Sequence, residues 1–97
     1  MNKPAHIPVT NNREHHQFEA HIDGHTAFAS YRQTGDVISF THTEVPEELE
    51  GRGIAAALAK TALDFSRENK LKVMPLCPYF ESFIAKHKEY QDLVMEM

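Results

Sequence analysis

Cys77, His42 and Glu44 are the side chains whose types and spacing suit covalent or acid–base chemistry. Cys77 is the single cysteine of the chain, and a thiol becomes nucleophilic beside a base or at a helix N-terminus. The Pro78-Tyr79 sequence after it is typical of a helix start, which would place Cys77 at such a terminus. His42 and Glu44 lie two residues apart in an expected strand, on one face. Because histidine titrates near neutrality, His42 is the first candidate for a general base and Glu44 the second.

Each of these residues also has a plainer interpretation. A lone cysteine is usually a buried core thiol, so an inert Cys77 stays open as an alternative to a nucleophile. His42 equally fits a polar side chain that bonds a neighbouring backbone group. No metal site is expected, because the chain has no HExxH sequence and no ligand-spaced Asp, Glu or Cys partners for the histidines at positions 15, 16, 21 and 25.

A loop with two glycines, Glu50-Gly51-Arg52-Gly53, separates a strand that ends at Val45 from a helix that begins near Ile54. Glycine lets the backbone approach a ligand closely, and the first amides of a helix have no internal partners. Together with the helix dipole, these amides form an anion site that suits a diphosphate. Arg52 is the cation that we assign to it. The alternative is a plain strand-to-helix connection, since neither the Walker A sequence nor the dinucleotide fingerprint is matched in full.

The elements that must position these residues follow from hydrophobic periodicity and turn residues. Alternation predicts strands over residues 17–22, 25–33 and 37–44, joined by turns at Asp23-Gly24 and Thr34-Gly35-Asp36. We expect an antiparallel meander in which one face of the third strand carries Ile38, Phe40, His42 and Glu44. Residues 1–13 are polar and contain two prolines, and we expect a loose or edge-pairing N-terminal segment there.

Two helices and one more strand are predicted after the loop. A helix from Ile54 to about Asn69 has an apolar stripe at helical spacing, consisting of Ile54, Leu58, Thr61, Ala62 and Phe65. A short strand over 71–77 contains Pro75, which indicates an edge or a bulge. A second helix over 79–87 has Phe80, Phe83 and Ile84 as its apolar side. The fold class is therefore a mixed α/β (α+β) domain over residues 14–97, a meander followed by a β-loop-α-β-α unit.

Length and composition exclude several classes of protein. The 97 residues, 41% hydrophobic and 25% charged, suit one small globular domain. One cysteine excludes a disulfide scaffold or a Cys-rich zinc module and, with no apolar h-region at the start, favours a cytoplasmic location. No apolar run approaches the ~20 residues of a membrane span. A net charge of −4 argues against general affinity for nucleic acid.

The loop and its neighbours resemble the acyl-CoA-binding motif Q/R-x-x-G-x-G/A of the GNAT superfamily of N-acetyltransferases. The resemblance rests on His42-Thr43-Glu44-Val45 and on the run from Leu49 to Leu58. Gly53 matches the fixed glycine and Ala55 the final small residue, whereas Glu50 stands where the family usually has Gln or Arg. Further on, Pro75-Leu76-Cys77-Pro78 resembles a Pro-x-Cys-Pro element of the minimal single-domain branch. The resemblance covers roughly residues 15–95.

The resemblance implies acetyl-CoA (coenzyme A) as the cofactor. Two adjacent parallel strands, one ending at Val45 and the other near Cys77, would splay and hold pantetheine between them. The diphosphate would lie on the loop amides, and the Val45 amide would polarise the thioester carbonyl. Tyr79 would contact the cofactor or protonate the leaving thiolate, and Phe80 fits either a cofactor contact or the core. The implied cofactor-binding residues are Val45, Gly51, Arg52, Gly53, Ile54, Ala55, Ala56, Cys77, Tyr79 and Phe80.

The expected function is transfer of an acetyl group to an amine by direct attack, with His42 or Glu44 as the base. A ping-pong route through acetyl-Cys77 is the alternative within enzymes. The alternatives outside enzymes are a CoA-binding module without turnover and a structural adaptor without a ligand. Because the chain is too short for the helices that shape the acceptor pocket in longer members, the acceptor side is expected to be open or completed by a partner. The sequence indicates neither the acceptor nor the oligomeric state.

Overall fold

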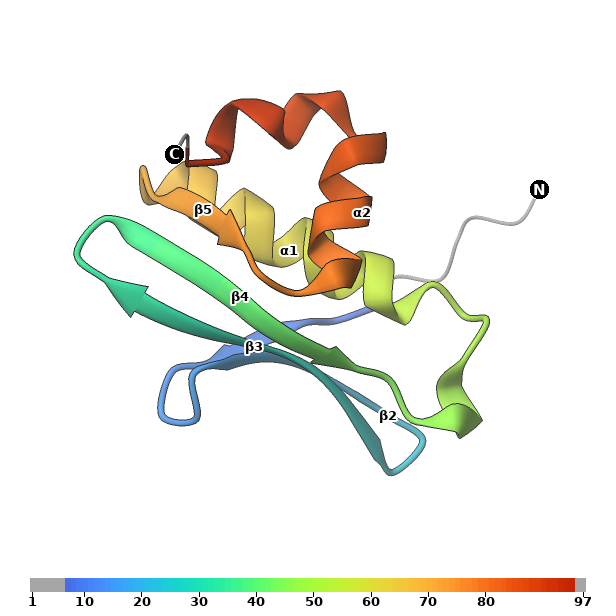
Figure 1. Ribbon diagram of the computed structural model, residues 1–97. Helices are drawn as coiled ribbons and strands as arrows, with labels where there is room; N and C mark the ends of the chain where they lie inside the picture. Colours follow the sequence, from blue (N-terminus) through green and yellow to red (C-terminus); the bar gives the residue numbers. More distant parts are fainter. Residues whose placement is uncertain (1–6, 96–97) are drawn as a thin grey trace.

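A five-stranded sheet with helices on one side forms the structure, a computed structural model that describes residues 7–95 (Figure 1). The strands are β1 (Thr10–Asn12), β2 (Gln17–Ile22), β3 (His25–Thr34), β4 (Val37–Glu44) and β5 (Lys72–Pro75). The helices are α1 (Ile54–Glu68) and α2 (Pro78–Lys86), with 3-10 turns η1 (Glu47–Leu49) and η2 (Lys88–Leu93). The strand order follows the sequence, and only the β4–β5 pair is parallel.

The predicted meander and both of its turns are confirmed, and so is the mixed α/β class. Asp23 and Gly24 both have positive φ, 52° and 79°, as a two-residue hairpin turn between twisted strands requires. Strand β5 is shorter than predicted because the Leu76 amide turns back to the Met74 carbonyl at 3.0 Å. It lies at the sheet edge, as Pro75 indicates. Of the expected N-terminal segment, Thr10–Asn12 pairs with β2, and residues 1–6 lie outside the described part of the chain.

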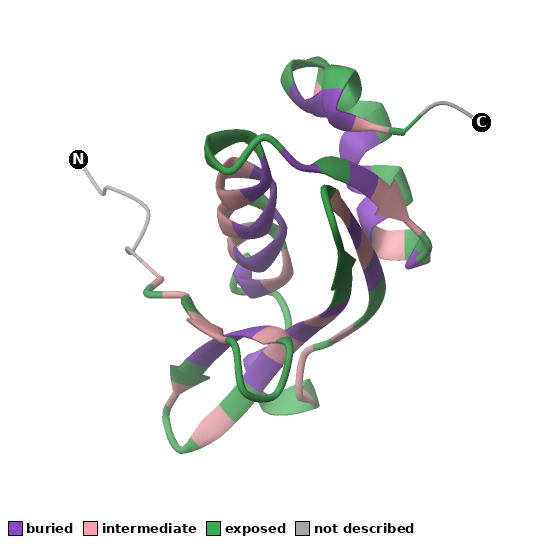
Figure 2. Ribbon diagram, turned by 90° about the vertical axis from the view of Figure 1, so that its left-hand side faces the viewer, coloured by how far each residue is buried: buried purple, intermediate pink, exposed green. Residues whose placement is uncertain are grey.

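The hydrophobic core lies between the sheet and the two helices (Figure 2). The rings of Phe40 on β4 and Phe80 on α2 stack with centroids 4.3 Å apart, which fixes the start of α2 against β4. The predicted α1 stripe is confirmed in part, because Thr61 and Phe65 are only half-buried and Leu63 and Ser66 are buried instead. Helix α1 contacts α2 and η2 as well as the sheet, so its buried face is wider than a single stripe.

The face predicted for His42 and Glu44 is wrong, because β4 contains a β-bulge at Thr41. Phe40 lies opposite Tyr31 and His42 lies opposite Ser30, so Thr41 has no partner on β3. One extra residue reverses the alternation of side chains beyond it.

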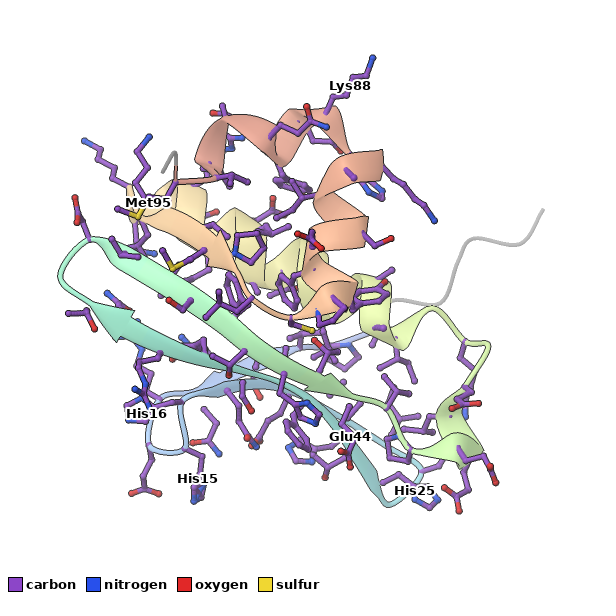
Figure 3. The ribbon with its side chains drawn as sticks, viewed as in Figure 1. His15, His16, His25, Glu44, Lys88 and Met95 are labelled. Carbon is purple, nitrogen blue, oxygen red and sulfur yellow. The ribbon has the colours of Figure 1, made fainter. Side chains whose placement is uncertain are left out.

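Beyond the bulge, Thr43 takes the inner face of the sheet. Thr43 lies opposite Ala29, which is fully buried beneath the helices, and directly opposed residues share a face. Glu44 lies opposite Phe28 on the other face, and Figure 3 shows Glu44 on the side of the sheet away from the helices. We call this side, which carries His42 and Glu44, the open face.

Candidate active site

The loop before α1 has the backbone geometry of an anion site. Gly51 and Gly53 have φ of 82° and 75°, in the left-handed region that favours glycine. The Ala57 amide donates to the Gly53 carbonyl at 3.1 Å, and the three amides at 54–56 precede it and have no intrahelical acceptor. A Cβ added at either glycine would meet no atom within 4 Å, so the loop faces open space. The loop residues therefore fit a diphosphate group, with the positive end of the helix dipole behind them.

Arg52 lies inside this loop, and its guanidinium forms one solvent-exposed ion pair. Its Nη1 lies 3.0 Å from Asp23 Oδ2 at the tip of the β2–β3 hairpin, and the two side chains are 47% and 68% exposed. Exposed ion pairs of this kind contribute little to stability, so Arg52 can exchange Asp23 for a bound anion at small cost.

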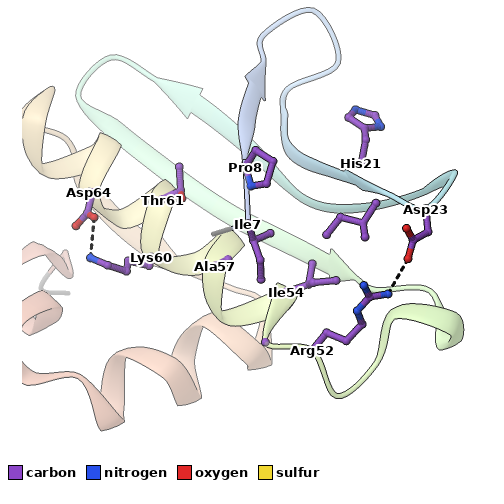
Figure 4. Close-up of a pocket in the computed structure, with 12 residues that line it drawn as sticks. Ile7, Pro8, His21, Asp23, Arg52, Ile54, Ala57, Lys60, Thr61 and Asp64 are labelled. Carbon is purple, nitrogen blue, oxygen red and sulfur yellow. Dashed lines mark hydrogen bonds and ion pairs between the residues drawn. The ribbon is translucent and has the colours of Figure 1, made fainter. Parts of the chain in front are cut away.

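A cavity of about 1010 Å³ adjoins the loop on the side of α1 that faces β2 (Figure 4). Gly53 and Ile54 form one end of it, and the ion pair between Lys60 and Asp64, 3.2 Å apart, lies at the other end. Ile7 and Pro8 form part of its wall.

The second part of the candidate site lies where β4 and β5 separate. Their last pair is Phe40 with Pro75, after which the Cys77 amide donates to the Phe40 carbonyl at 2.8 Å. From there β4 continues to Glu44, while the other chain turns into α2 at Pro78. The β4 residues beyond the bulge therefore have no partner strand on the β5 side among the described residues. Val45 follows the last β3–β4 pair directly.

Cys77 lies on the inner face of this separation and contacts Thr43. Its side chain is buried, 4% exposed, and its Sγ lies 3.3 Å from Thr43 Oγ1. Cys77 is also the residue that precedes the first turn of α2, with Pro78 at the first helical position, as predicted. The sulfur nevertheless makes no hydrogen bond to the helix amides.

His42 and Glu44 form a pair on the open face. His42 Nε2 lies 3.2 Å from Glu44 Oε1, and the two side chains are 60% and 61% exposed. The Phe28 ring lies beside His42 with centroids 6.0 Å apart. The structure therefore brings these two predicted residues together, but places them on the opposite face of β4 from Cys77.

The two aromatic candidates after Cys77 differ in exposure. Phe80 is fully buried against Phe40, which agrees with its interpretation as a core residue. Tyr79 is half-buried, and this burial raises the pKa of its phenol above the ordinary value of about 10, at which a tyrosine is already protonated at neutral pH.

Sequence reasoning missed Thr43 and Glu19. Nothing in the local sequence indicates the bulge that turns Thr43 toward Cys77. Glu19 is almost buried on the open face, where it accepts hydrogen bonds from Gln17 and Asn12 and contacts His21. The Gln17 hydrogen bond is the main cause that lowers the pKa of Glu19. The alternation of β2 places Gln17, Glu19 and His21 on one face. This pattern is the sequence signal from which the hydrogen bonds around Glu19 could have been predicted.

Three comparisons with known proteins agree with one another. The sequence pattern of a family described as GCN5-related N-acetyl-transferase matches residues 17–93, which include both the loop and Cys77. Protein NATD1 of Mus musculus is 37% identical over 84 residues, which cover 84% of this chain and 76% of that protein. Protein NATD1 of Xenopus tropicalis is 34% identical over 90 residues, covering 90% and 83%.

A solved structure supports the same grouping. The solution structure of a GCN5-like protein from Staphylococcus aureus matches with a TM-score of 0.73 at 26% identity, over 94% of this chain and 90% of that one. Within residues 7–95, no helix is both long and apolar enough to cross a membrane.

Proposed function

The chain belongs to the GCN5-related N-acetyl-transferase family, and from this premise we propose that it transfers acetyl from acetyl-CoA to an amine by direct attack. One observation carries the proposal. Unpartnered amides at the start of α1 lie on the same connection that leaves the free end of β4, and that end separates from β5 after Phe40. An anion site and an open strand edge joined by one short loop suit a ligand with a diphosphate and an extended acyl arm.

The loop binds the diphosphate in this proposal. Gly51 and Gly53 let the backbone approach the phosphates, and the amides of residues 52–56 donate to them. Arg52 exchanges its ion pair with Asp23 for a phosphate oxygen. Glu50 replaces the Gln or Arg of the family motif, and this costs one side-chain donor while the backbone donors remain.

The reaction takes place at the free end of β4. When bound, acetyl-CoA supplies an activated thioester carbonyl there. The Val45 amide donates to the carbonyl oxygen as negative charge develops on it. The bond between the amine nitrogen and the acetyl carbon forms as the carbon–sulfur bond breaks. Tyr79, whose phenol is protonated at neutral pH, donates to the leaving thiolate.

The His42–Glu44 pair takes the proton that the amine loses. His42 accepts this proton, and Glu44 orients the ring through the 3.2 Å contact at Nε2. Because both side chains lie on the open face, the amine approaches from the side of the sheet away from α1 and α2. Removing a proton from the amine is required, since only a neutral amine attacks the thioester.

We further assign the chain to the minimal single-domain branch. Pro75 ends β5 and Pro78 begins α2, so the Pro-x-Cys-Pro element holds Cys77 between two fixed backbone positions. Residues 14–97 form the acyl-CoA-binding domain in this assignment, and the preceding segment of residues 1–13 pairs with the edge of its sheet through Thr10–Asn12.

The test is an acetylation assay with radiolabelled acetyl-CoA and a panel of amines: a lysine peptide, a peptide with a free N-terminus, a polyamine and a small primary amine. We expect turnover with at least one class, and we expect Cys77→Ala to retain a third or more of it. Loss of nearly all activity in Cys77→Ala, together with acetyl-Cys77 in the wild-type chain by mass spectrometry, would instead support the ping-pong route. Tight CoA binding without turnover across the panel would support a binding module.

A further inference from the structure

The buried contact between Thr43 and Cys77 is not used by direct amine attack. Thr43 Oγ1 lies 3.3 Å from Cys77 Sγ, and the hydroxyl is the polar group that the sulfur contacts. The contact joins two elements that are 34 residues apart in sequence, at the point where β4 and β5 separate. A hydrogen bond at this position affects the reactivity of the Cys77 thiol as a nucleophile.

The placement of Cys77 before α2 would by itself favour a reactive thiol. A residue in this position can receive hydrogen bonds from the first helix amides, and such bonds stabilise a thiolate. In this chain the sulfur makes no hydrogen bond to those amides. It lies instead beside Thr43, in a position that is 4% exposed. The thiol is therefore directed away from the group that would activate it.

The bulge at Thr41 is the cause of this arrangement. Without the extra residue, the alternation of β4 would turn Thr43 to the open face and leave its neighbours facing Cys77. With it, a neutral hydroxyl faces the sulfur, and the His42–Glu44 pair lies on the other face. The only cysteine in the chain thus contacts Thr43, while the candidate bases on either side of Thr43 in sequence, His42 and Glu44, lie on the other face of β4.

We propose that Thr43 is a positioning residue that restrains the Cys77 thiol, so that acetyl transfer proceeds by direct amine attack. The 3.3 Å contact allows either atom to donate, and in the proposed restraint the Cys77 S–H donates to Thr43 Oγ1, which holds the neutral thiol. The competing route would form a bond between Cys77 Sγ and the acetyl carbon, break the bond to the CoA sulfur and pass the thiol proton to the CoA thiolate. Only the link to this route rests on the proposed function, because the restraint itself is a property of the free protein.

The first test measures alkylation of Cys77 by iodoacetamide in the free protein, with folding checked by thermal melting. Thr43→Val keeps the shape of the side chain and removes the hydroxyl, and we expect alkylation to become about fivefold faster. Thr43→Ser keeps the hydroxyl and should alkylate at the wild-type rate. Thr34→Val, at the exposed end of β3, is the matched control and should also match the wild type. Because the chain has one cysteine, the adduct mass reports this thiol alone.

Two results would overturn the restraint. The first is an alkylation rate in Thr43→Val equal to or below that of the wild type. The second is faster alkylation in both Thr43→Val and Thr43→Ser, which would mean that the methyl group limits access. If Thr43→Val does not fold, the comparison of Thr43→Ala with Thr43→Ser replaces it, since these two differ only by the hydroxyl. We expect Thr43→Ala to alkylate about fivefold faster than Thr43→Ser, and equal rates would overturn the proposal.

A second readout tests the link to acetyl transfer. In acetyl-CoA without an amine, we expect acetyl-Cys77 to accumulate faster in Thr43→Val than in the wild-type chain, by about the same factor. Faster alkylation without faster acetylation would overturn this link and leave the restraint standing. Absence of acetyl transfer to any amine would contradict the proposed function, whereas the alkylation rates do not depend on it.

Discussion

The two ends of the candidate site are built in different ways. The loop end is local, because its glycines, its free amides and Arg52 all lie within residues 50–56. The acyl end is assembled from β4, the end of β5 and the start of α2, and its faces depend on a single extra residue at Thr41. In the proposed function, binding of acetyl-CoA therefore depends on a short stretch of sequence, whereas the route of acetyl transfer depends on strand register.

The largest expected effect is a loss of affinity for acetyl-CoA when the loop before α1 is altered. Gly53→Val places a β-branched side chain at φ of 75°, directly before the amides of α1. We expect its affinity for acetyl-CoA, measured by calorimetry, to fall about 100-fold or more, because the side chain occupies the space where the phosphates approach.

Gly35→Val is the matched control for this substitution. Gly35 also has positive φ, 58°, and a Cβ there also meets open space, so both variants carry a similar backbone strain of ~1–2 kcal/mol. The control should lose comparable stability and keep its affinity. Equal affinity of Gly53→Val and Gly35→Val for acetyl-CoA would mean that the loop is a plain connection.

A smaller effect is expected from substitutions of His42 and Glu44 at the acyl end of the site. These substitutions should lower kcat and leave the affinity for acetyl-CoA nearly unchanged. We expect His42→Ala to lower kcat by about 100-fold at neutral pH, the usual contribution of a general base, and Glu44→Gln by about tenfold. Affinity for acetyl-CoA should stay within about twofold, because neither side chain belongs to the loop. His21→Ala, on the open face of another strand, is the control and should keep its kcat. A raised KM with unchanged kcat in His42→Ala would show that His42 binds the acceptor and does not take its proton.

The sequence allowed prediction of the loop end but only part of the acyl end. Glycines at 51 and 53 before an amphipathic stretch are local signals, and the structure has the expected positive φ and helix start. The approach of Cys77 to β4 was implied by the resemblance to the acetyltransferase family. The faces of His42 and Glu44 were predicted wrongly, because a bulge depends on how β3 and β4 pair, and the alternation of residues 37–44 looks regular. For the same reason, no local sequence signal indicates that Thr43 faces Cys77.

The smallest expected effect concerns the stability of the open face. Hydrogen bonds, first that of Gln17, lower the pKa of Glu19 in the folded chain. Its stabilising contribution is therefore complete above the ordinary carboxyl pKa of about 4.3 and is lost as pH falls through the lowered pKa. Glu19→Gln should be less stable than the wild type by about 1 kcal/mol at pH 7 in urea unfolding, and the gap should narrow from pH 5 to pH 3. A difference in unfolding free energy that stays constant from pH 5 to pH 3 would contradict a stabilising role of the Glu19 carboxylate. Gly53→Val should show the same acid dependence as the wild type, since the loop has no part in this network.

Amide chemical shifts during titration with acetyl-CoA and, separately, with CoA test the central claim most directly, because they report both ends of the site in one experiment. The account predicts that the amides of residues 52–56 shift similarly with the two ligands. It also predicts that the amides of Val45 and Cys77 shift differently, since only one ligand carries the acetyl group. Shifts that leave residues 52–56 unchanged, or that do not distinguish the two ligands at Val45 and Cys77, would contradict it.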